Sequence, residues 1–476
     1  MKTSPRLFAL ATTVLLAACA STHQLRPEAV LVQPDSLQIR QSLGGTPIDA
    51  ASWPQVQWWT AYGDPQLNDL VNEALAGNPT LQIAAARTRE ALAQVAAANS
   101  KRLPSADFSA QAARGRFSEH GLLPPPFAGN WDTLAQLTAT LSWQVDFWGK
   151  NRAAYESALG AARAADVDAQ AARLTLAANV VHVYAQLEDD TLQLAVAQDT
   201  LQQREQILAL TGQRNAAGLD SRLEVTQAQA AIPAAREQID TLQEAAARGR
   251  HALAALTGAG PDRALSIHDP ALSVIAQPAL PSAVPAELLG HRPDLVAQRW
   301  RVEAASQGIR EAKAEFYPNV DLIAFIGLQN LGSTTLLSAA NREYGVAPAI
   351  SLPLFDAGKR RATLSARDAQ YDAAVEQYNQ IVTDALREVV DALTSLDSLA
   401  AQRGEQHDAL ADTQEAYDLS VLRYREGVGN YLQVLSTESQ LLAQRSLEAQ
   451  LRARSLDLSV DLVMALGGGF LPSAPR

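Results

Sequence analysis

The chain has little of several residue types on which whole classes of function depend. Its 476 residues include one cysteine, and aromatic residues make up 5%. A single cysteine excludes a disulfide scaffold and a metal site built from several thiolates. The 39 basic residues are outnumbered by 51 acidic ones, which argues against nucleic-acid binding, because that depends on clustered Lys and Arg. Beyond the N-terminal segment, no run approaches the roughly 20 apolar residues of a membrane-spanning helix.

Signals of catalysis and of cofactor binding are also missing. No pair of histidines has the spacing of a metal site, and no glycine-rich phosphate loop follows an expected strand. His291-Arg292-Pro293-Asp294 resembles a kinase catalytic loop only faintly. The paired acids Asp189-Asp190 fall on a long polar helix face, where solvation is the default. We therefore expect no enzyme activity, no cofactor and no bound metal.

The N-terminal segment has the features of a bacterial lipoprotein signal. A basic start precedes an uncharged run over 7–18, which is too short to span a bilayer but typical of a secretory signal. Leu16-Ala17-Ala18-Cys19 resembles the lipobox, in which the cysteine becomes the lipidated first residue; Ala20 favours, in lipoproteins of this kind, sorting to the outer membrane. We expect a signal peptide over 1–18 and a lipidated N-terminal tail over 19–63. The alternative is a chance cysteine behind an ordinary signal.

The rest of the sequence repeats itself. Gly218 matches Gly427, and the residues that follow match in the same order; such ordered matches indicate a duplicated unit. The other matched segments are Asn78-Pro79-Thr80-Leu81 with Arg292-Pro293-Asp294-Leu295, Phe147-Trp148-Gly149-Lys150 with Phe355-Asp356-Ala357-Gly358-Lys359, and Leu223-Glu224-Val225 with Leu432-Gln433-Val434. We predict one copy over 64–257 and a second over 286–466, with a linker over 258–285 and a C-terminal tail over 467–476.

Each copy begins with an expected helix followed by a β-hairpin. The first helix runs from an Asp64 cap to Ala98, and its counterpart covers 294–316. The hairpins cover 104–147 and 318–355. Over 134–147 apolar and polar residues alternate strictly, as in a strand with one wet and one apolar face. The alternation is long enough for a tilted outer-membrane strand, which needs about 9–11 residues. The alternative is a soluble hairpin packed on the helices.

Two long helical hairpins, over 149–257 and 358–466, complete the copies. No proline interrupts 150–213, and Val180, Leu187, Leu194, Leu201 and Leu208 recur every seventh residue. In the second copy Tyr371, Val375, Tyr378, Val382, Ala385, Val389, Ala392, Leu396 and Leu399 alternate by four and three. These heptads predict coiled-coil packing. Each hairpin breaks at a Gly-bearing tip and resumes with Asp220 or Asn430 as the expected cap.

These elements predict a mainly α protein with membrane β-structure. Only helices and closed barrels can span lipid, because every backbone group must be hydrogen-bonded. Four strands in one chain cannot close a barrel, whereas three chains supply twelve, within the known range for such barrels. The predicted assembly is a trimeric 12-stranded barrel continuous with a long α-helical coiled-coil tunnel, in which the polar strand faces line a wet lumen.

Several motifs in this plan resemble one protein family. They are the lipobox, Pro285-Ala286-Glu287-Leu288-Leu289, Arg292-Pro293-Asp294-Leu295, Phe316-Tyr317-Pro318, Phe355-Asp356-Ala357-Gly358-Lys359 and Tyr424-Arg425-Glu426-Gly427-Val428-Gly429-Asn430-Tyr431-Leu432. Together they resemble the outer membrane factor family, the TolC-like, NodT-type exit ducts of tripartite efflux pumps. The resemblance implies a passive channel in the outer membrane of a Gram-negative bacterium. It implies a homotrimer that contacts outer-membrane lipid, a periplasmic adaptor (membrane fusion protein) and an inner-membrane pump, commonly of the resistance-nodulation-division type.

The resemblance also implies a gate at the periplasmic tips. Tyr424 and Arg425 would make inter-helix contacts that close it, and Leu432 would narrow the pore. Ser436 stands where the family often has an acidic residue, which puts a carboxylate ring in doubt. The first copy lacks the Tyr-Arg pair, so we expect the second hairpin to do most of the closing. The alternative is that both residues simply face solvent at a turn.

The turns themselves are expected to meet the adaptor. The residues of this predicted contact are Gly218, Leu219, Asp220, Gly427, Val428 and Asn430. An alternative function is a periplasmic coiled-coil adaptor or structural lipoprotein. Adaptors have one helical hairpin rather than two in tandem, and they lack strands of membrane length. The exported compound is not specified by the sequence, since selection belongs to the pump.

Overall fold

The computed structural model describes residues 25–33, 37, 48–49, 53–273, 280–281, 290–332 and 336–471. The predicted signal peptide, Cys19 and part of the linker lie outside the described residues. The chain divides into two compact units, which we describe separately. Unit 1 holds the main sheet and comprises Arg87–Asp166, Ala297–Asn379 and the described part of Met1–Leu31. Unit 2 comprises the described parts of Val32–Ala86, Val167–Val296 and Gln380–Arg476.

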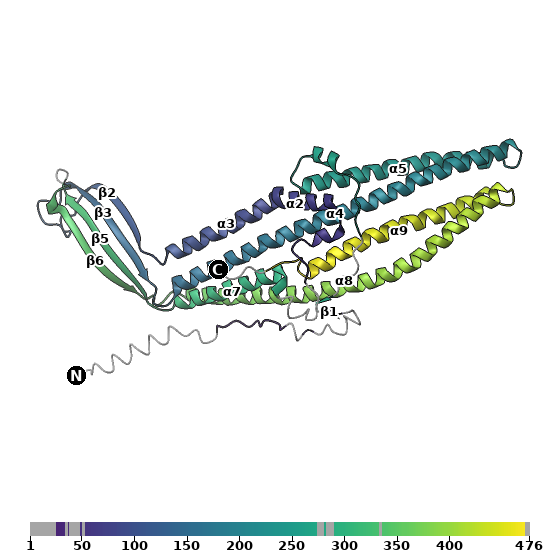
Figure 1. Ribbon diagram of the computed structural model, residues 1–476. Coiled ribbons are helices and arrows are strands. Elements are labelled where there is room, and N and C mark those ends of the chain that lie inside the picture. The colour runs from purple at the N-terminus through teal and green to yellow at the C-terminus, as the bar shows by residue number, and fades with distance from the viewer. Residues whose placement is uncertain are drawn as a thin grey trace. The chain divides into compact units, whose positions relative to one another are not determined.

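A helix, two strands and two long helices follow one another twice along the chain (Figure 1). The first series is α3 (Pro79–Ser100), β2 (Ser105–Arg116), β3 (Trp131–Val145), α4 (Lys150–Ala216) and α5 (Arg222–Leu256). The second series is α7 (Pro293–Ala314), β5 (Asn319–Leu331), β6 (Arg342–Ser351), α8 (Lys359–Arg425) and α9 (Tyr431–Ala465). Shorter elements are α2 (Pro65–Gly77), the 3-10 helices η2 (Trp58–Tyr62), η3 (Pro261–Ser266) and η4 (Ala339–Asn341), and the strands β1 (Ile48–Asp49) and β4 (Leu280–Pro281).

Unit 1 contains a four-stranded sheet in the order β2-β3-β5-β6, with every neighbouring pair antiparallel (Figure 1). The predicted alternation fixes which residues share a face, since successive side chains of a strand point to opposite sides. Leu137 lies opposite Ala110 and Leu328, whereas Thr138 lies opposite Ser109 and Gly327. The predicted strand over 134–147 is confirmed, although it begins at Trp131 and ends at Val145.

The apolar face of the sheet is exposed to a degree unusual for large hydrophobic side chains. Phe108 is 71% exposed, Ile326 65%, Tyr344 79% and Ile350 75%. A contiguous apolar patch of this kind marks an interaction with lipid or another protein. The second hairpin, predicted over 318–355, is shorter than expected, because β6 ends at Ser351, before Pro353; proline has no N–H for the strand ladder.

In unit 1 the helices α4 and α7 pack closely against each other. A Cβ on Gly160 of α4 would lie 3.0 Å from the Cβ and 3.2 Å from the backbone of Ala304 in α7, which is tighter than an ordinary contact, so glycine lets the two helices approach closely. Ser157 of the preceding turn donates to the Ala304 carbonyl at 2.8 Å. Further along unit 1, Asp372 of α8 accepts the N–H groups of Glu28 and Ala29, both at 3.0 Å, and thereby holds the described N-terminal segment.

Two hydrophobic clusters can be described in unit 2 from the residues that the structure describes. The larger joins η2, α2, α4, α5 and α9, with Tyr62, Val180, Tyr184, Leu187 and Leu253 fully buried. The smaller cluster lies toward the hairpin tips. The predicted heptad positions in this unit are buried as expected in the second series, with Val382, Ala385, Val389, Ala392, Leu396 and Leu399 all in the core.

The single helix predicted from Asp64 to Ala98 is wrong. The structure has two helices, α2 and α3, separated at Asn78. Pro79 lacks the N–H that a continuous helix needs and restricts the residue before it, and the Asn78 side chain instead accepts the Thr80 N–H at 2.7 Å. The predicted Asp64 cap is confirmed, since its carboxylate accepts the Gln66 N–H at 2.8 Å.

None of the described helices is apolar over a stretch long enough to cross a bilayer.

Candidate functional site at the hairpin tips

The two helical hairpins turn sharply within unit 2, and glycine makes each turn possible. Gly218 between α4 and α5 has a φ of 76°, and Gly427 between α8 and α9 has a φ of 81°. Only glycine adopts such positive values without a steric penalty. In Figure 1 α5 runs back along α4, and α9 runs back along α8. The tips therefore bring together residues from four helix ends.

The caps of the returning helices differ from one another. Asn430 begins α9 as predicted, with its side chain accepting the Gln433 N–H at 2.9 Å. The prediction that Asp220 caps α5 is wrong, because Ser221 is the cap. Ser221 accepts the Leu223 N–H at 3.1 Å, and Glu224 accepts the Ser221 N–H at 2.9 Å, a capping box. Asp220 is thereby free for another contact.

Asp220 uses its carboxylate to bind Arg214, which lies at the end of α4. The guanidinium donates from Nε at 2.8 Å and from Nη2 at 3.1 Å, one bond to each carboxylate oxygen. Both side chains are only 9% exposed. A bidentate pair of this kind is among the stronger polar contacts in proteins, since it combines charge with fixed geometry.

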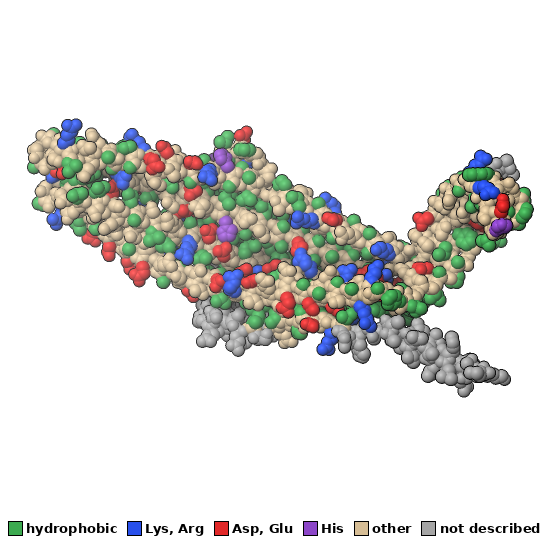
Figure 2. Space-filling model, turned by 180° about the vertical axis from the view of Figure 1, so that it is seen from behind, with side chains coloured by type: hydrophobic (Ala, Val, Ile, Leu, Met, Phe, Trp, Pro, Cys, Tyr) green, Lys and Arg blue, Asp and Glu red, His purple; other side chains and the backbone are tan. Residues whose placement is uncertain are grey.

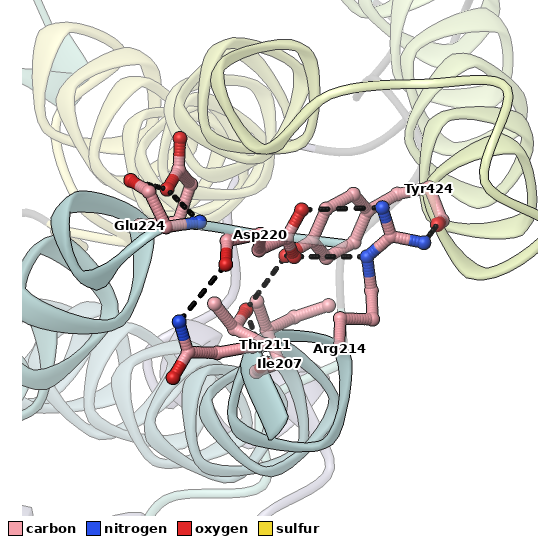
Figure 3. A network of polar contacts seen from close by, with 8 residues as sticks. Ile207, Thr211, Arg214, Asp220, Glu224 and Tyr424 are labelled. Carbon is pink, nitrogen blue, oxygen red and sulfur yellow. Dashed lines mark hydrogen bonds and ion pairs between the residues drawn. The ribbon is translucent and has the colours of Figure 1, made fainter. Parts of the chain in front are cut away.

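Tyr424 of α8 connects this ion pair to the second hairpin (Figure 3). Its hydroxyl donates to Asp220 and lies 3.1 Å from the Thr211 hydroxyl. Arg214 donates from Nη1 to the Tyr424 carbonyl at 2.7 Å, and its guanidinium lies 4.5 Å from the centre of the Tyr424 ring. Tyr424 is fully buried. We call Thr211, Arg214, Asp220 and Tyr424 the tip network.

Charge and burial shift the pKa values of the tip network in ways that keep it intact at neutral pH. Hydrogen bonding from Arg214, then from Tyr424, lowers the pKa of Asp220 below its ordinary value. Burial, followed by the bond to Asp220, raises the pKa of Tyr424 to about 12. The hydrogen bond to Asp220 raises the pKa of Arg214. Asp220 is therefore ionised and Tyr424 neutral over the whole physiological range.

A second ion pair lies farther from the tips. Arg204 of α4 donates from Nε to Glu438 of α9 at 3.0 Å, and from Nη1 to the carbonyl of Ala231 in α5 at 3.2 Å. The Glu438 side chain is 7% exposed and that of Arg204 19%. Pro233, inside α5, comes two residues after Ala231. Arg204 thus connects α4 with both α9 and α5.

Of the gate residues predicted from the sequence, one is buried in this structure and the other three are exposed. Tyr424 is part of the tip network, whereas Arg425 is exposed and the arginine that contacts Tyr424 is Arg214. Leu432 is 63% exposed, and Ser436 is also exposed. The expected adaptor-contact residues lie at the turns; of these, Leu219 is 65% and Val428 68% exposed, Gly218, Gly427 and Asn430 are exposed, and Asp220 is partly buried.

Arg214 and Thr211 were not singled out as gate residues from the sequence. A possible signal was an arginine followed, across a glycine turn, by an aspartate six positions later. Such a pair can close over the turn, but nothing in the local pattern identifies Tyr424 as its third partner, because that contact comes from the other hairpin. In the described residues, no group of three or more His, Cys, Asp or Glu side chains has an arrangement that could hold a metal.

Comparisons with known proteins find relatives over most of the chain. A family model described as outer membrane efflux protein matches residues 70–259 and 284–468. The chain is 39% identical to fusaric acid resistance protein FusA of Burkholderia cepacia over 366 residues, 76% of this chain and 69% of that protein. It is 30% identical to multidrug resistance outer membrane protein MdtQ of Escherichia coli O157:H7 over 465 residues, 96% of each.

Two solved structures have the same fold over most of their length. The outer membrane protein VceC of Vibrio cholerae superposes with a TM-score of 0.83 and 36% identity, covering 88% of this chain and all of that one. The outer-membrane channel OprN gives a TM-score of 0.82 and 29% identity, covering 94% of this chain and 99% of the other.

Proposed function

The chain belongs to the outer membrane efflux protein family, whose members are outer-membrane exit ducts, and we propose that it works as a homotrimer gated at its hairpin tips. The chain's place is the outer membrane of a Gram-negative bacterium, and its function is that of an efflux duct rather than of an enzyme. Three copies would supply twelve strands for one barrel. The single observation that carries this proposal is the four-stranded sheet with one exposed apolar face and, among the described residues, two open edges, β2 and β6.

The partners follow from the same argument. An open strand edge with unpaired N–H and C=O groups needs a partner, and in lipid it cannot remain unpaired. The β2 edge of one copy pairs in this proposal with the β6 edge of the next. The exposed tip residues Leu219 and Val428 offer apolar contacts to a periplasmic adaptor, which in turn joins the duct to an inner-membrane pump of the resistance-nodulation-division type.

The chain organisation is part of the proposal. The predicted copies, 64–257 and 286–466, each supply one hairpin of strands and one of helices, joined by the linker 258–285 and followed by the tail 467–476. A signal peptide over 1–18 is removed, and Cys19 carries a lipid that anchors the tail 19–63 to the outer membrane. The substrates are small molecules such as drugs, in keeping with the resistance named for FusA and MdtQ.

The gate of the duct is the tip network together with the exposed tip residues. The Arg214–Asp220–Tyr424 contacts hold the first hairpin against the second within one chain. We propose that breaking them lets the tips separate. Arg425, exposed in the single chain, would contact a neighbouring copy; Leu432 would narrow the pore, with Ser436 one turn further along α9.

The test is reconstitution of the purified full-length protein. In planar lipid bilayers a gated duct gives single channels of small conductance, and in cells the protein appears in the outer-membrane fraction and supports drug export with its pump. Absence of channels from a correctly folded oligomer, or recovery of the protein as a soluble monomer, would overturn the duct.

A further inference from the structure

Charged residues on the four strands of the sheet are sorted by sign between its two faces. The acids Asp107, Asp132, Asp321 and Glu343 all lie on the polar face. Each of them lies opposite a small or polar residue of a neighbouring strand. Asp107 lies opposite Thr140, and Glu343 lies opposite Gly327. The three arginines of the strands, Arg114, Arg116 and Arg342, all lie on the apolar face. A duct lumen needs only one wet face, so cations on the apolar face call for a separate explanation.

The arginines lie at one end of that face. Arg116 is the last residue of β2, Arg114 is two positions before it, and Arg342 is the first residue of β6. This is the end that carries the loops between paired strands, opposite the end that joins the helices α3 and α4. Figure 2 shows Lys and Arg side chains at this free end of the sheet. Nearer the helices the same face is apolar, so the charges border the apolar band without interrupting it.

Aromatic residues lie beside these arginines. Trp131 stands directly opposite Arg116 and is 66% exposed, and Tyr344, two positions from Arg342, is 79% exposed. Tryptophan and tyrosine are typical of the level where a membrane protein meets the lipid headgroups. The arginines are therefore placed at headgroup height rather than among acyl chains.

Most of this positive charge is not used within the chain. Arg116 pairs with Glu119 at 3.1 Å, but both side chains are more than half exposed. In the part of the chain that the structure describes, neither Arg114 nor Arg342 has an ion-pair or hydrogen-bond partner for its guanidinium. Both side chains are exposed. Exposed, unpaired guanidiniums are suited to bidentate contacts with phosphate.

We propose that Arg114, Arg116 and Arg342 form an arginine rim that binds the phosphorylated headgroups of outer-leaflet lipid. The proposal rests on the proposed function, which places the apolar face against lipid and the strand loops outside the cell. Acyl chains contact the apolar face, while the lipid phosphates reach the rim. Its positive charge complements an anionic leaflet, whereas an acidic partner protein would gain little from the apolar band beneath it.

The test measures lipid binding by the purified full-length protein in detergent. The probe is lipid A bearing both phosphates, compared with the same lipid after removal of its phosphates and with inorganic phosphate alone. Wild-type protein is expected to bind the phosphorylated lipid best and inorganic phosphate least. The double variant Arg114→Gln/Arg342→Gln should bind the phosphorylated lipid about 25-fold more weakly, from about fivefold for each basic residue near a charged surface.

Two further variants make the result interpretable. Arg114→Lys/Arg342→Lys keeps the charge but loses the bidentate geometry, so its binding should fall between that of wild type and that of the glutamine variant. Arg248→Gln, on the exposed surface of α5 with a side chain 79% exposed, should bind as wild type. Equal binding of phosphorylated and dephosphorylated lipid, or no loss in the glutamine variant, would overturn the rim. The proposed function is contradicted by a different result. A protein that forms no channels and is absent from the outer membrane refutes the proposed duct, whatever lipid it binds.

Discussion

Asp220 is the residue on which the tip network converges. It accepts two bonds from Arg214 of its own hairpin and one from Tyr424 of the other. Charge-assisted hydrogen bonds are each worth about 1.5–3 kcal/mol, and losing one partner leaves the other buried without compensation. The free energy that holds the two hairpins together at their tips should therefore depend strongly on this single carboxylate.

Replacing Asp220 by Asn should raise the single-channel conductance. The amide has no charge to offer the buried Arg214 guanidinium, so the closed arrangement loses roughly 1.5–3 kcal/mol relative to the open one. The measurement is conductance in planar bilayers. Asp199→Asn serves as the control, because Asp199 is an exposed acid on α4, the helix that precedes the turn with Asp220. Equal conductance of Asp220→Asn and wild type would contradict the role of the network.

The same conductance measurement distinguishes the role of Arg214 from that of Arg425. Arg214→Met removes three hydrogen bonds within the chain, and it should raise conductance more than Arg425→Ala, whose side chain is exposed in the single chain. A rise with Arg425→Ala shows that contacts between copies add to closure. If only Arg425→Ala opened the channel, the gate would lie between copies and the assignment to Arg214 would be wrong.

The tip network should respond to pH at both extremes. The pKa of Asp220 is lowered from 3.8, so its stabilisation is complete above that value and is lost as the pH falls through the lowered pKa. The pKa of Tyr424 is raised from 10 to about 12, so its stabilisation is complete below pH 10 and is lost as the pH rises to 12.

Conductance should accordingly be constant between these limits and rise in strong acid and strong alkali. Asp220→Asn should remove the acid limb, and Tyr424→Phe the alkaline limb. A wild-type conductance that changes around neutral pH would point to a different titrating group.

Among the elements, the long helices were largely predictable and their mutual contacts were not. The start of α4 at Lys150 follows from the sequence, since Gly149 ends the strand segment and no proline follows for many turns. The break at Asn78 is not predicted, because the helical spacing of apolar residues in this alanine-rich segment favours one continuous helix, whereas Asn78-Pro79 favours a break. The Arg204–Glu438 pair could not be read from the sequence, since its two residues belong to different hairpins and only packing brings them together.

The Arg204–Glu438 pair should contribute to stability only while both partners are present. Glu438→Gln leaves the partly buried Arg204 without its counter-charge, and breaking a buried pair costs up to roughly 3–5 kcal/mol. We expect a lower melting temperature of the detergent-solubilised protein. The double variant Arg204→Met/Glu438→Leu should recover most of the loss, because an apolar pair needs no desolvation.

Glu415→Gln is the matched control for that comparison, since Glu415 is exposed on α8 and its loss should leave melting unchanged. A double variant as unstable as Glu438→Gln would show that the site requires charge for a reason other than pairing.

For the whole molecule, the acid-only polar face of the sheet predicts how the duct treats ions. In a trimer, Asp107, Asp321 and Glu343 would line the lumen with negative charge and no basic residue of the strands on that face. Such a surface attracts cations and repels anions. The overall acid excess was evident from composition, but its restriction to one face required the strand register.

Asp107→Asn/Asp321→Asn should therefore reduce the preference for cations. The measurement is the reversal potential of the reconstituted channel in a salt gradient, which should move toward zero. Asp262→Asn, in η3 and outside the sheet, is the control and should leave the reversal potential unchanged. An unchanged value in the double variant would place the selectivity elsewhere in the duct.

The central claim is that three copies close one barrel by joining β2 of one chain to β6 of the next, and cysteine crosslinking in outer membranes tests it most directly. Val346→Cys on the apolar face of β6 would be combined, one at a time, with Ala106→Cys, Phe108→Cys, Ala110→Cys or Ala112→Cys on the same face of β2. We predict that at least one pairing gives crosslinked dimers and trimers under oxidation and nothing larger. Monomers alone in every pairing, or a ladder that continues past three, would contradict it.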